Sequence, residues 1–515
     1  MNKNLKIFKK IFLSISILIF SSSLSQYAGA AHHGAHEHHA DPLKVLMITG
    51  GGPYHDYYTQ LRQLTEGLTD RIGNIEFTIE HNEGANKRDM YFKFESLQTN
   101  EWTQNFDLVL YNSCNLHVAQ GNPEYVDKII QAHVESQIPA VMTHCPMHLH
   151  RTNAPNWYNF TGAESYVHEV VNTPFTIELL EPNNPIMVNF PDTWRTPNGE
   201  LYMPVELKDN ATPLARAYGA EPAEFFPIAW THEYEGVRVF SSTLGHHNVT
   251  MGSDVNLNLV AAGLLWAAGK LNDDGAPYKG YSGERGLGWI SLLKGGTLHG
   301  WRATQTTDWA SFSWWDGKDI WPSKENMGTD SFKLVAGKAE HLLRMPKHDA
   351  PDPDVYSNTV LVEGPQSNLF YLGPIDGGDF KNFEFKVDVY TSPGSASGIY
   401  FHTRYKNDGR PVYGYEAQIN ASRRGESKTG SLVGVSEVNT ASHADNEWFS
   451  YYIKVDGKKV TIKVNGETVN EFTEPQDAEG PASLRRGTIA LESISSKKSR
   501  VQFRNPRIRL LPDNN

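Results

Sequence analysis

Histidines recur in three segments of the chain, each of which follows a short apolar run. The segments are Tyr54-His55-Asp56, His144-Cys145-Pro146-Met147-His148 and Leu244-Gly245-His246-His247. Any one of these histidines alone reads as an ordinary surface residue, but three segments on one sheet edge indicate a site. We predict His144 and Glu200 as catalytic residues and His55 and His246 as metal ligands, with His247 as a further candidate. Imidazoles and a carboxylate suit either proton transfer or a divalent metal such as zinc, and the sequence does not choose.

A second group of polar residues alternates with apolar residues near the C-terminal end. We predict Glu416 and His402 as catalytic residues there. The predicted substrate-binding residues are Tyr400, Arg404, Gln418, Lys454 and Asn465. Amides, carboxylates and guanidinium groups form hydrogen bonds with hydroxyl-rich ligands such as sugars. A solvated sheet face gives the same alternation, so the pattern alone leaves both explanations open.

The elements that carry the histidines alternate strand and helix. Ligands of open parallel sheets bind at the carboxyl ends of the strands, where the three histidine segments fall. The expected strands are Lys44–Thr49, Phe106–Tyr111 and Pro139–Thr143, and the expected helices are Tyr57–Ile72, Glu124–Glu135 and Val255–Ala268. This cadence predicts a flavodoxin-like α/β domain with a parallel sheet over residues 44–270, followed by a linker at 271–287.

From residue 288 to residue 511 the hydrophobic period becomes two. Phe383, Phe385, Val387 and Val389 alternate with polar residues, and Asp456-Gly457 marks a hairpin turn. Many short strands with almost no helix predict an all-β domain, a jelly roll or concanavalin-like sandwich. The fold class is therefore multidomain, α/β followed by all-β.

The N-terminal residues predict export. A basic start, a ten-residue apolar run from Ile11 to Phe20 and the small residues Ala28-Gly29-Ala30 form the layout of a signal peptide over residues 1–30. A His-rich tail follows at 31–43, and cleavage would leave a periplasmic or secreted protein without stable membrane association. The formal net charge of −12 argues against nucleic acid as a partner. The sequence does not fix the oligomeric state.

The chain contains two cysteines, Cys114 and Cys145. They follow strands that we expect to be neighbours, so one disulfide is possible in an oxidising compartment. A nucleophilic Cys145 is the competing reading. Nucleophile elbows place glycines around the reactive residue, and Thr143, His144, Pro146 and Met147 stand there instead, which disfavours thiol catalysis.

The first domain resembles the ThuA-like family. The resemblance rests on Lys44–Gly50 with the His55 loop, Ala140–His148, Gly199-Glu200-Leu201-Tyr202 and Val239–His247, in that order. It implies a class I glutamine amidotransferase-like fold and an association with disaccharide use through 3-keto sugars.

The second domain resembles the 3-keto-disaccharide hydrolase domain. The motifs are Leu298-His299-Gly300-Trp301, Ala396–His402, Gly414–Ile419, Thr429–Leu432, Glu447-Trp448, Asn465-Gly466 and Phe503–Ile508. The sequence departs from the family at Phe449, at His402 and at Glu492-Ser493-Ile494-Ser495, where a family histidine is missing. An insertion carries Trp309, Trp314, Trp315 and Trp321, either a packed loop or a platform for sugar.

Together the resemblances imply an exported enzyme that cleaves 3-keto-glycosides. A ketone at C3 acidifies the C2 hydrogen, so a base can remove it and the C1 oxygen then leaves by β-elimination. The alternative is a catalytic ThuA-like domain that carries a non-catalytic carbohydrate-binding sandwich. The expected partner is in both cases a carbohydrate.

Overall fold

The computed structural model describes residues 40–513 except 86–88, 149–153, 166, 170, 204, 294–297, 299, 305–331, 336–358, 365, 426, 479–484 and 495. The predicted signal peptide, nearly all of the His-rich tail, His299 and the four tryptophans of the insertion lie outside the described residues.

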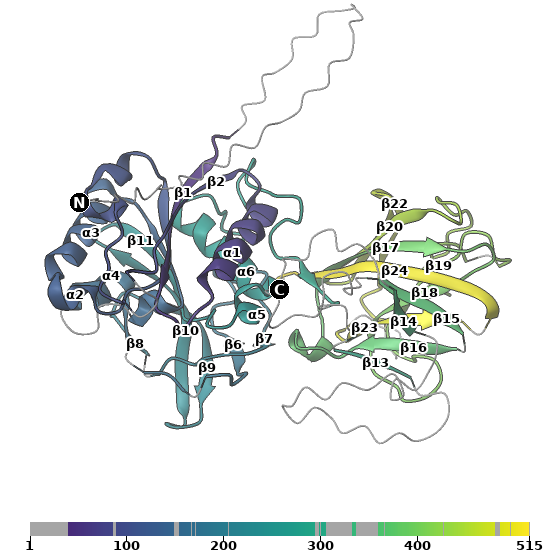
Figure 1. Ribbon diagram of the computed structural model, residues 1–515. Coiled ribbons are helices and arrows are strands. Elements are labelled where there is room, and N and C mark those ends of the chain that lie inside the picture. Colours follow the sequence, from purple (N-terminus) through teal and green to yellow (C-terminus); the bar gives the residue numbers. More distant parts are fainter. Residues whose placement is uncertain are drawn as a thin grey trace, which may run out of the picture. The chain divides into compact units, whose positions relative to one another are not determined.

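The first domain contains a nine-stranded sheet in its described part (Figure 1). Strands β2, β1, β3, β4 and β11 are parallel to one another, and strands β10, β9, β6 and β7 continue the sheet antiparallel. The strands are β1 (Leu43–Gly51), β2 (Ile75–His81), β3 (Leu108–Cys114), β4 (Ala140–Thr143), β6 (Thr176–Leu179), β7 (Thr193–Arg195), β9 (Thr212–Gly219), β10 (Glu224–Tyr234) and β11 (Val237–Ser242). The predicted α/β class of this domain is confirmed. The sheet itself is mixed, because only its first five strands are parallel.

A tight hairpin causes the change of direction in this sheet. Tyr234 pairs with Val237, so only Glu235 and Gly236 connect β10 to β11, and both have positive φ angles, 49° and 86°. Two consecutive residues with positive φ form the turn whose twist matches antiparallel strands, and glycine adopts this conformation readily.

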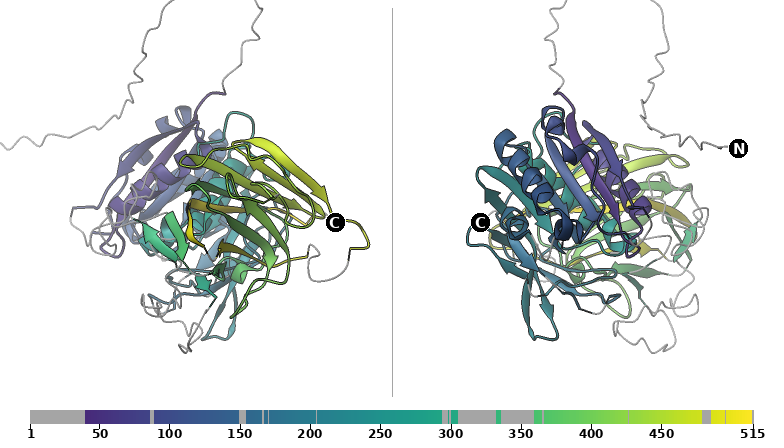
Figure 2. Two further views of the ribbon diagram at one scale, coloured as in Figure 1. Left: turned by 90° about the vertical axis from the view of Figure 1, so that its right-hand side faces the viewer. Right: turned by 60° about the vertical axis from the view of Figure 1, so that its left-hand side comes forward.

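Helices cover the sheet on both faces (Figures 1 and 2). Helices α1 and α6 contribute to one core and α3 and α4 to another. The helices are α1 (Tyr57–Ile72), α2 (Val118–Gly121), α3 (Pro123–Ser136), α4 (Pro155–Thr161), α5 (Asn248–Met251) and α6 (Asp254–Ala267), with 3₁₀ turns η1 (Ser96–Gln98), η2 (Glu101–Gln104) and η3 (Cys145–His148). The Asp56 side chain accepts a hydrogen bond from Thr59 N–H and caps α1, which fixes the end of the His55 loop. Strands β5 (Ala163–Ser165) and β8 (Val205–Leu207) form a separate pair.

The second domain consists of two antiparallel sheets in its described part. The order of the larger sheet is β14-β15-β24-β17-β20-β21-β22, with β12 paired to β24, and that of the smaller is β13-β16-β23-β18-β19. The strands are β12 (Ile290–Ser291), β13 (Trp301–Ala303), β14 (Phe332–Val335), β15 (Thr359–Gly364), β16 (Ser367–Tyr371), β17 (Phe383–Thr391), β18 (Ser397–Thr403), β19 (Tyr415–Ile419), β20 (Trp448–Asp456), β21 (Lys459–Val464), β22 (Glu467–Thr473), β23 (Thr488–Ser493) and β24 (Ser496–Leu510); a 3₁₀ turn, η6, spans Asp376–Gly378.

The alternation predicted for this domain is present. Phe383, Phe385, Val387 and Val389 of β17 are fully buried and belong to the apolar core. Strands β20 and β21 pair up to Asp456 and Lys459, so the predicted hairpin turn is confirmed. Within the described ranges, no helix has the length and apolar character that a membrane crossing requires.

Candidate functional site

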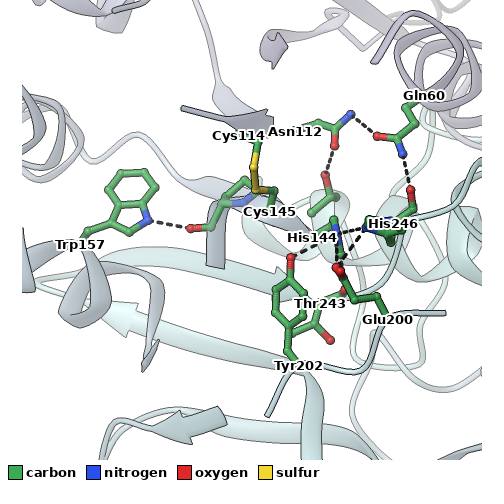
Figure 3. The surroundings of a disulfide bond; sticks show 12 residues. Gln60, Asn112, Cys114, His144, Cys145, Trp157, Glu200, Tyr202, Thr243 and His246 are labelled. Carbon is green, nitrogen blue, oxygen red and sulfur yellow. Dashed lines mark hydrogen bonds and ion pairs between the residues drawn. A yellow bond between two sulfur atoms is a disulfide. The ribbon is translucent and has the colours of Figure 1, made fainter. Parts of the chain in front are cut away.

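His144 is held rigidly at the carboxyl end of β4. Its φ angle is +61°, and its backbone N–H donates to Ser242 O at 2.7 Å. Its Nδ1 lies 2.7 Å from Thr243 O (Figure 3). A carbonyl oxygen only accepts hydrogen bonds, so Nδ1 carries a proton and Nε2 is the ring nitrogen that faces the other histidines.

Glu200 joins the histidines into one cluster, which we call the His–Glu centre and define by His55, His144, Glu200 and His246. Glu200 Oε2 lies 3.1 Å from both His144 Nε2 and His246 Nδ1, which are 3.3 Å apart (Figure 3). His168 Nδ1 lies 3.3 Å from Glu200 Oε1, and the Tyr202 hydroxyl lies 3.2 Å from His144 Nε2. The sequence prediction missed His168 and Tyr202, although Tyr202 stands two residues after Glu200.

His55 reaches the same place from the loop between β1 and α1. Its ring centroid lies 4.9 Å from that of His144 and 4.7 Å from that of His246. The buried Nδ1 of His55 has no hydrogen-bond partner in the described part of the chain. Burial, followed by the charges of His144 and His246, lowers the pKa of His55 well below its ordinary value, so the ring is neutral at physiological pH.

For the Glu200 carboxylate, the neighbouring histidines have a larger effect on the pKa than burial has. Burial raises the pKa of Glu200, but hydrogen bonds and charge from His144 and His246 outweigh burial and hold that pKa far below its ordinary range. His247 stands outside the cluster; its ring centroid lies 4.5 Å from that of His246, and burial lowers its pKa to about 4.

Helix α1 fixes the His246 segment. Gln60 Nε2 donates to the carbonyl oxygens of Gly245 at 2.8 Å and His246 at 3.1 Å. Gly245 has a φ angle of +117°, and a Cβ there would lie 2.4 Å from Met251 Cε, so the backbone bend that aims His246 requires glycine.

The His–Glu centre fits a divalent metal. Three potential ligand atoms, His144 Nε2, His246 Nδ1 and Glu200 Oε2, converge with separations of 3.1, 3.1 and 3.3 Å. Two ligands at tetrahedral angles around zinc lie about 3.3 Å apart, because each metal–ligand bond is about 2.0 Å long. One nitrogen from each of His55, His144 and His246 lies within 4.8 Å of the other two. A positive charge at this point, whether a metal ion or a proton, offsets the repulsion between the lone pairs.

The two cysteines form a disulfide at the edge of this cluster. Cys114 and Cys145 are bonded, with 5.4 Å between their Cα atoms, which ties the end of β3 to the residue after His144 (Figure 3). A bonded sulfur cannot act as a thiolate, so the alternative of a nucleophilic Cys145 is wrong for this state of the protein.

In the second domain Tyr400 and Glu416 lie together. They are register partners on β18 and β19, and the Tyr400 hydroxyl donates to Glu416 Oε2 at 2.7 Å. Burial raises the pKa of Glu416. Burial and then the charge of Glu416 raise the pKa of Glu492 on β23, whose side chain is 1% exposed. Arg410 Nε lies 3.8 Å from Glu492 Oε1, and the sequence prediction missed both Glu492 and Arg410.

His402 does not join Glu416. Strand β18 has one extra residue between Tyr400 and Thr403, and His402 within this bulge has a φ angle of +53°. Its ring packs against Phe383, 5.7 Å between centroids, and its Nε2 bonds to Lys381 O at 2.7 Å. Burial lowers the pKa of His402 to about 4. Regular alternation along β18 would place His402 on the same face as Tyr400, as we expected from the sequence. This expectation is wrong, because the bulge reverses the alternation.

The remaining predicted residues are dispersed. Gln418 is half-buried on β19, and its Oε1 accepts from Ile419 N–H at 3.1 Å. Arg404 is exposed, 5.1 Å from the Tyr413 ring centroid. Lys454 pairs with Asp456 at 3.1 Å, and Asn465, with a φ angle of +51°, accepts from Ser450 N–H at 2.9 Å.

From the sequence we expected Glu416, Lys454 and Asn465 to lie on one polar face, and this expectation is wrong. Lys454 and the turn residue Asn465 belong to the larger sheet, whereas Glu416 belongs to the smaller one. The polar positions of two packed sheets point away from each other, because their apolar positions meet between the sheets.

Two family matches, one in each domain, indicate a protein of the carbohydrate-related, glycosyl hydrolase-like class. Residues 44–267 match the family model described as Trehalose utilisation, ThuA, and residues 288–509 match the 3-keto-alpha-glucoside-1,2-lyase-like domain. The chain is thus a ThuA-like domain followed by a 3-keto-disaccharide hydrolase-like domain, and the predicted resemblances and their order are confirmed.

Solved structures resemble one domain at a time. A protein provisionally named ThuA-like from Parabacteroides merdae is 17% identical with a TM-score of 0.36, covering 47% of this chain and 97% of its own. One provisionally named a glycosyl hydrolase from Parabacteroides distasonis is 16% identical with a TM-score of 0.30, covering 43% and 94%. The carbohydrate binding module CBM66 from Bacillus subtilis is 12% identical with a TM-score of 0.22, covering 29% and 86%. No curated protein matches the chain.

Proposed function

We propose that this protein cleaves 3-keto-glycosides, with Glu416 as the base that removes the proton at C2. The electrons of the C2–H bond form the enolate of the C3 ketone, and the C1–O bond then breaks with its electrons on the departing oxygen, which takes up a proton. Water adds to the unsaturated sugar afterwards and gives net hydrolysis.

The observation that carries this proposal is the environment of Glu416. It is half-buried, holds a hydrogen bond from Tyr400 and has a raised pKa. A carboxylate whose pKa is raised toward neutrality is a stronger base than an ordinary surface carboxylate and still ionises. The family match of residues 288–509 supports the choice of substrate class.

The test replaces Glu416 with Gln and measures release of the aglycone from a 3-keto-glucoside. We expect turnover to fall by a factor of about 10² to 10⁴, the usual contribution of a general base. Glu467→Gln, which removes an exposed carboxyl on β22 of the same domain, is the control and should keep the wild-type rate. Deuterium at C2 should slow the wild-type reaction. Unchanged turnover in Glu416→Gln would reject the role.

The His–Glu centre supports a second candidate, in which the first domain performs metal-dependent sugar chemistry and the sandwich only binds carbohydrate. His55, His144, Glu200 and His246 would hold the ion, which supplies Lewis-acid polarisation of a sugar carbonyl oxygen when bound. The separations of 3.1 to 3.3 Å between ligand atoms favour this candidate. Turnover that survives Glu416→Gln but is lost in Glu200→Gln and with a chelator would select it.

We also propose that the protein is exported to the periplasm or beyond. The signal-peptide layout of residues 1–30 supports export, as does a disulfide between Cys114 and Cys145, since such bonds persist in oxidising compartments. N-terminal sequencing of the protein from the extracytoplasmic fraction should begin at Ala31; an intact Met1 would contradict the proposal.

A further inference from the structure

Glu492 is a buried carboxyl group that the proposed reaction does not yet use. Its side chain is 1% exposed, and apart from the neighbouring carboxyl of Glu416 neither of its oxygens has a hydrogen-bond partner in the described ranges. Arg410 is the nearest cation, and its Nε lies 3.8 Å away, beyond hydrogen-bond distance. A carboxylate this deeply buried with no donor would be costly, so its protonated form is favoured.

The backbone explains how Glu492 and Glu416 meet. Strand β18 lies between β23, which carries Glu492, and β19, which carries Glu416. The two outer strands are therefore about 10 Å apart, two strand spacings. Tyr400 pairs with both Glu416 and Ala490, so Glu492, two residues beyond Ala490, points to the same face.

Gly398 leaves the space in which the two carboxyl groups approach. It stands two residues before Tyr400 on β18, on this same face, and has no side chain. A Cβ at Gly398 would lie 2.8 Å from Glu416 Oε1 and 2.9 Å from Glu416 Cγ. The Glu416 side chain thus extends over Gly398, and a hydrogen bond between the two carboxyl groups lowers the pKa of Glu416 and raises that of Glu492.

Asn368 is a second, independent sign that this face receives a ligand. It is the register partner of Glu492 on β16, it is 0% exposed, and neither its Nδ2 nor its Oδ1 has a partner in the described part of the chain. An unpartnered buried amide beside the carboxyl pair offers a donor and an acceptor to a hydroxylated ring.

We propose that Glu492 and Glu416 share one proton, so that Glu492 is the positioning residue that donates a hydrogen bond to the Glu416 carboxylate and orients it toward C2 of the sugar. This inference rests on the proposed cleavage of 3-keto-glycosides. The pair carries one negative charge: Glu492 keeps its proton while Glu416 takes the proton from C2 and delivers it to the departing oxygen.

The charged groups around Glu416 and Glu492 determine how turnover depends on pH. Arg410 and Arg423 favour ionisation of Glu492, Arg410 also favours ionisation of Glu416, and Glu437 opposes it. Tyr400 stays protonated, because burial and then the two carboxyl groups raise its pKa. When the pH rises enough to ionise Glu492, two negative charges face each other and the orienting donor is lost, so turnover falls.

The experiment compares Glu492→Gln, which keeps a donor but cannot ionise, with Glu492→Ala, which loses both. We expect the alkaline limb of the kcat profile to move up by about one pH unit or more in Glu492→Gln. In Glu492→Ala, kcat should fall about tenfold below that of Glu492→Gln with KM changed less, as expected on loss of one charge-assisted hydrogen bond. A purely structural role would not move the alkaline limb.

Infrared spectroscopy of the full chain detects the proton on the Glu492–Glu416 pair without an activity measurement. The wild type at pH 7 should show a protonated carboxyl band that Glu492→Gln and Gly398→Ala lose and that Glu467→Gln keeps. If the wild type lacks the band, or if Glu492→Gln leaves the kcat profile unchanged, the proposal is overturned. If the wild type shows the band but does not cleave 3-keto-glycosides, the proposed function fails while the shared proton stands.

Discussion

Replacing His246 with Ala removes one of the three ligand atoms that converge in the His–Glu centre. His246 Nδ1 lies 3.1 Å from Glu200 Oε2 and 3.3 Å from His144 Nε2, close to the separation of about 3.3 Å between tetrahedral zinc ligands. We therefore expect the wild-type protein to bind one zinc ion per chain and His246→Ala to bind it at least about 100-fold more weakly, a loss of about 2.7 kcal/mol.

The consequence for thermal stability follows from mass action. At free zinc about 100 times its dissociation constant, binding stabilises the wild-type fold by about 2.7 kcal/mol, and the same zinc concentration stabilises His246→Ala by only about 0.4 kcal/mol. For a domain of this size, about 1 kcal/mol corresponds to about 2–4 °C. Zinc should thus raise the melting temperature of the wild-type domain by about 5–10 °C and that of the variant by about 1 °C.

The assay is calorimetric titration of chelator-treated protein with zinc, followed by thermal unfolding with and without the ion. His247→Ala is the matched control, because its ring centroid lies 4.5 Å from that of His246 and its nitrogens are not in the converging set. His247→Ala should keep the wild-type affinity. Equal zinc binding by His246→Ala and the wild type, or none by the wild type, would refute the reasoning.

Three further outcomes concern the scaffold around this centre. Replacing both Cys114 and Cys145 with Ser opens a loop with a sequence separation of 31 and should lower the free energy of unfolding by about 3–4 kcal/mol in urea titrations. Arg71→Met breaks a pair with Asp254 at 2.8 Å whose arginine side chain is 1% exposed, and should cost about 3 kcal/mol in the same assay. Burial lowers the pKa of His133 to about 4, so its neutral form stabilises the fold above pH 6.5, and about 3 kcal/mol should be lost as the pH falls from 6.5 to 4. His133→Phe should lack this slope; an identical slope would contradict it.

Local signals in the sequence were sufficient for the elements that begin and end at strong caps. The predicted helix Tyr57–Ile72 has those bounds in the structure, because Asp56 caps its start and Gly73 ends it. The convergence of His55, His144 and His246 was also predictable, since strand ends of a parallel sheet share one edge. The antiparallel strands β9 and β10 were not, because pairing partners across a sheet depend on contacts that no short segment encodes.

The sandwich shows where alternation stops being informative. A hydrophobic period of two predicts that His402 and Lys454 point away from the apolar core. It does not predict to which sheet each strand belongs or where a bulge lies. One extra residue in β18 placed His402 against Phe383, and the strand order placed Lys454 in a different sheet from Glu416. Both outcomes are set by tertiary pairing.

Glu492 was not predicted as a site residue, although the sequence marks its position as a departure from the family pattern. Glu492-Ser493 stands where the family pattern has a histidine, and the loss of that histidine counts against family-type catalysis. In the structure Glu492 adds a second titrating group beside Glu416, and the pair meets only because residue 398 on the intervening strand is glycine. A side chain at position 398 would separate the carboxyl groups and leave Glu416 an ordinary half-buried acid. The chemistry of this face therefore depends on a residue with no functional group, one that a search for reactive side chains passes over.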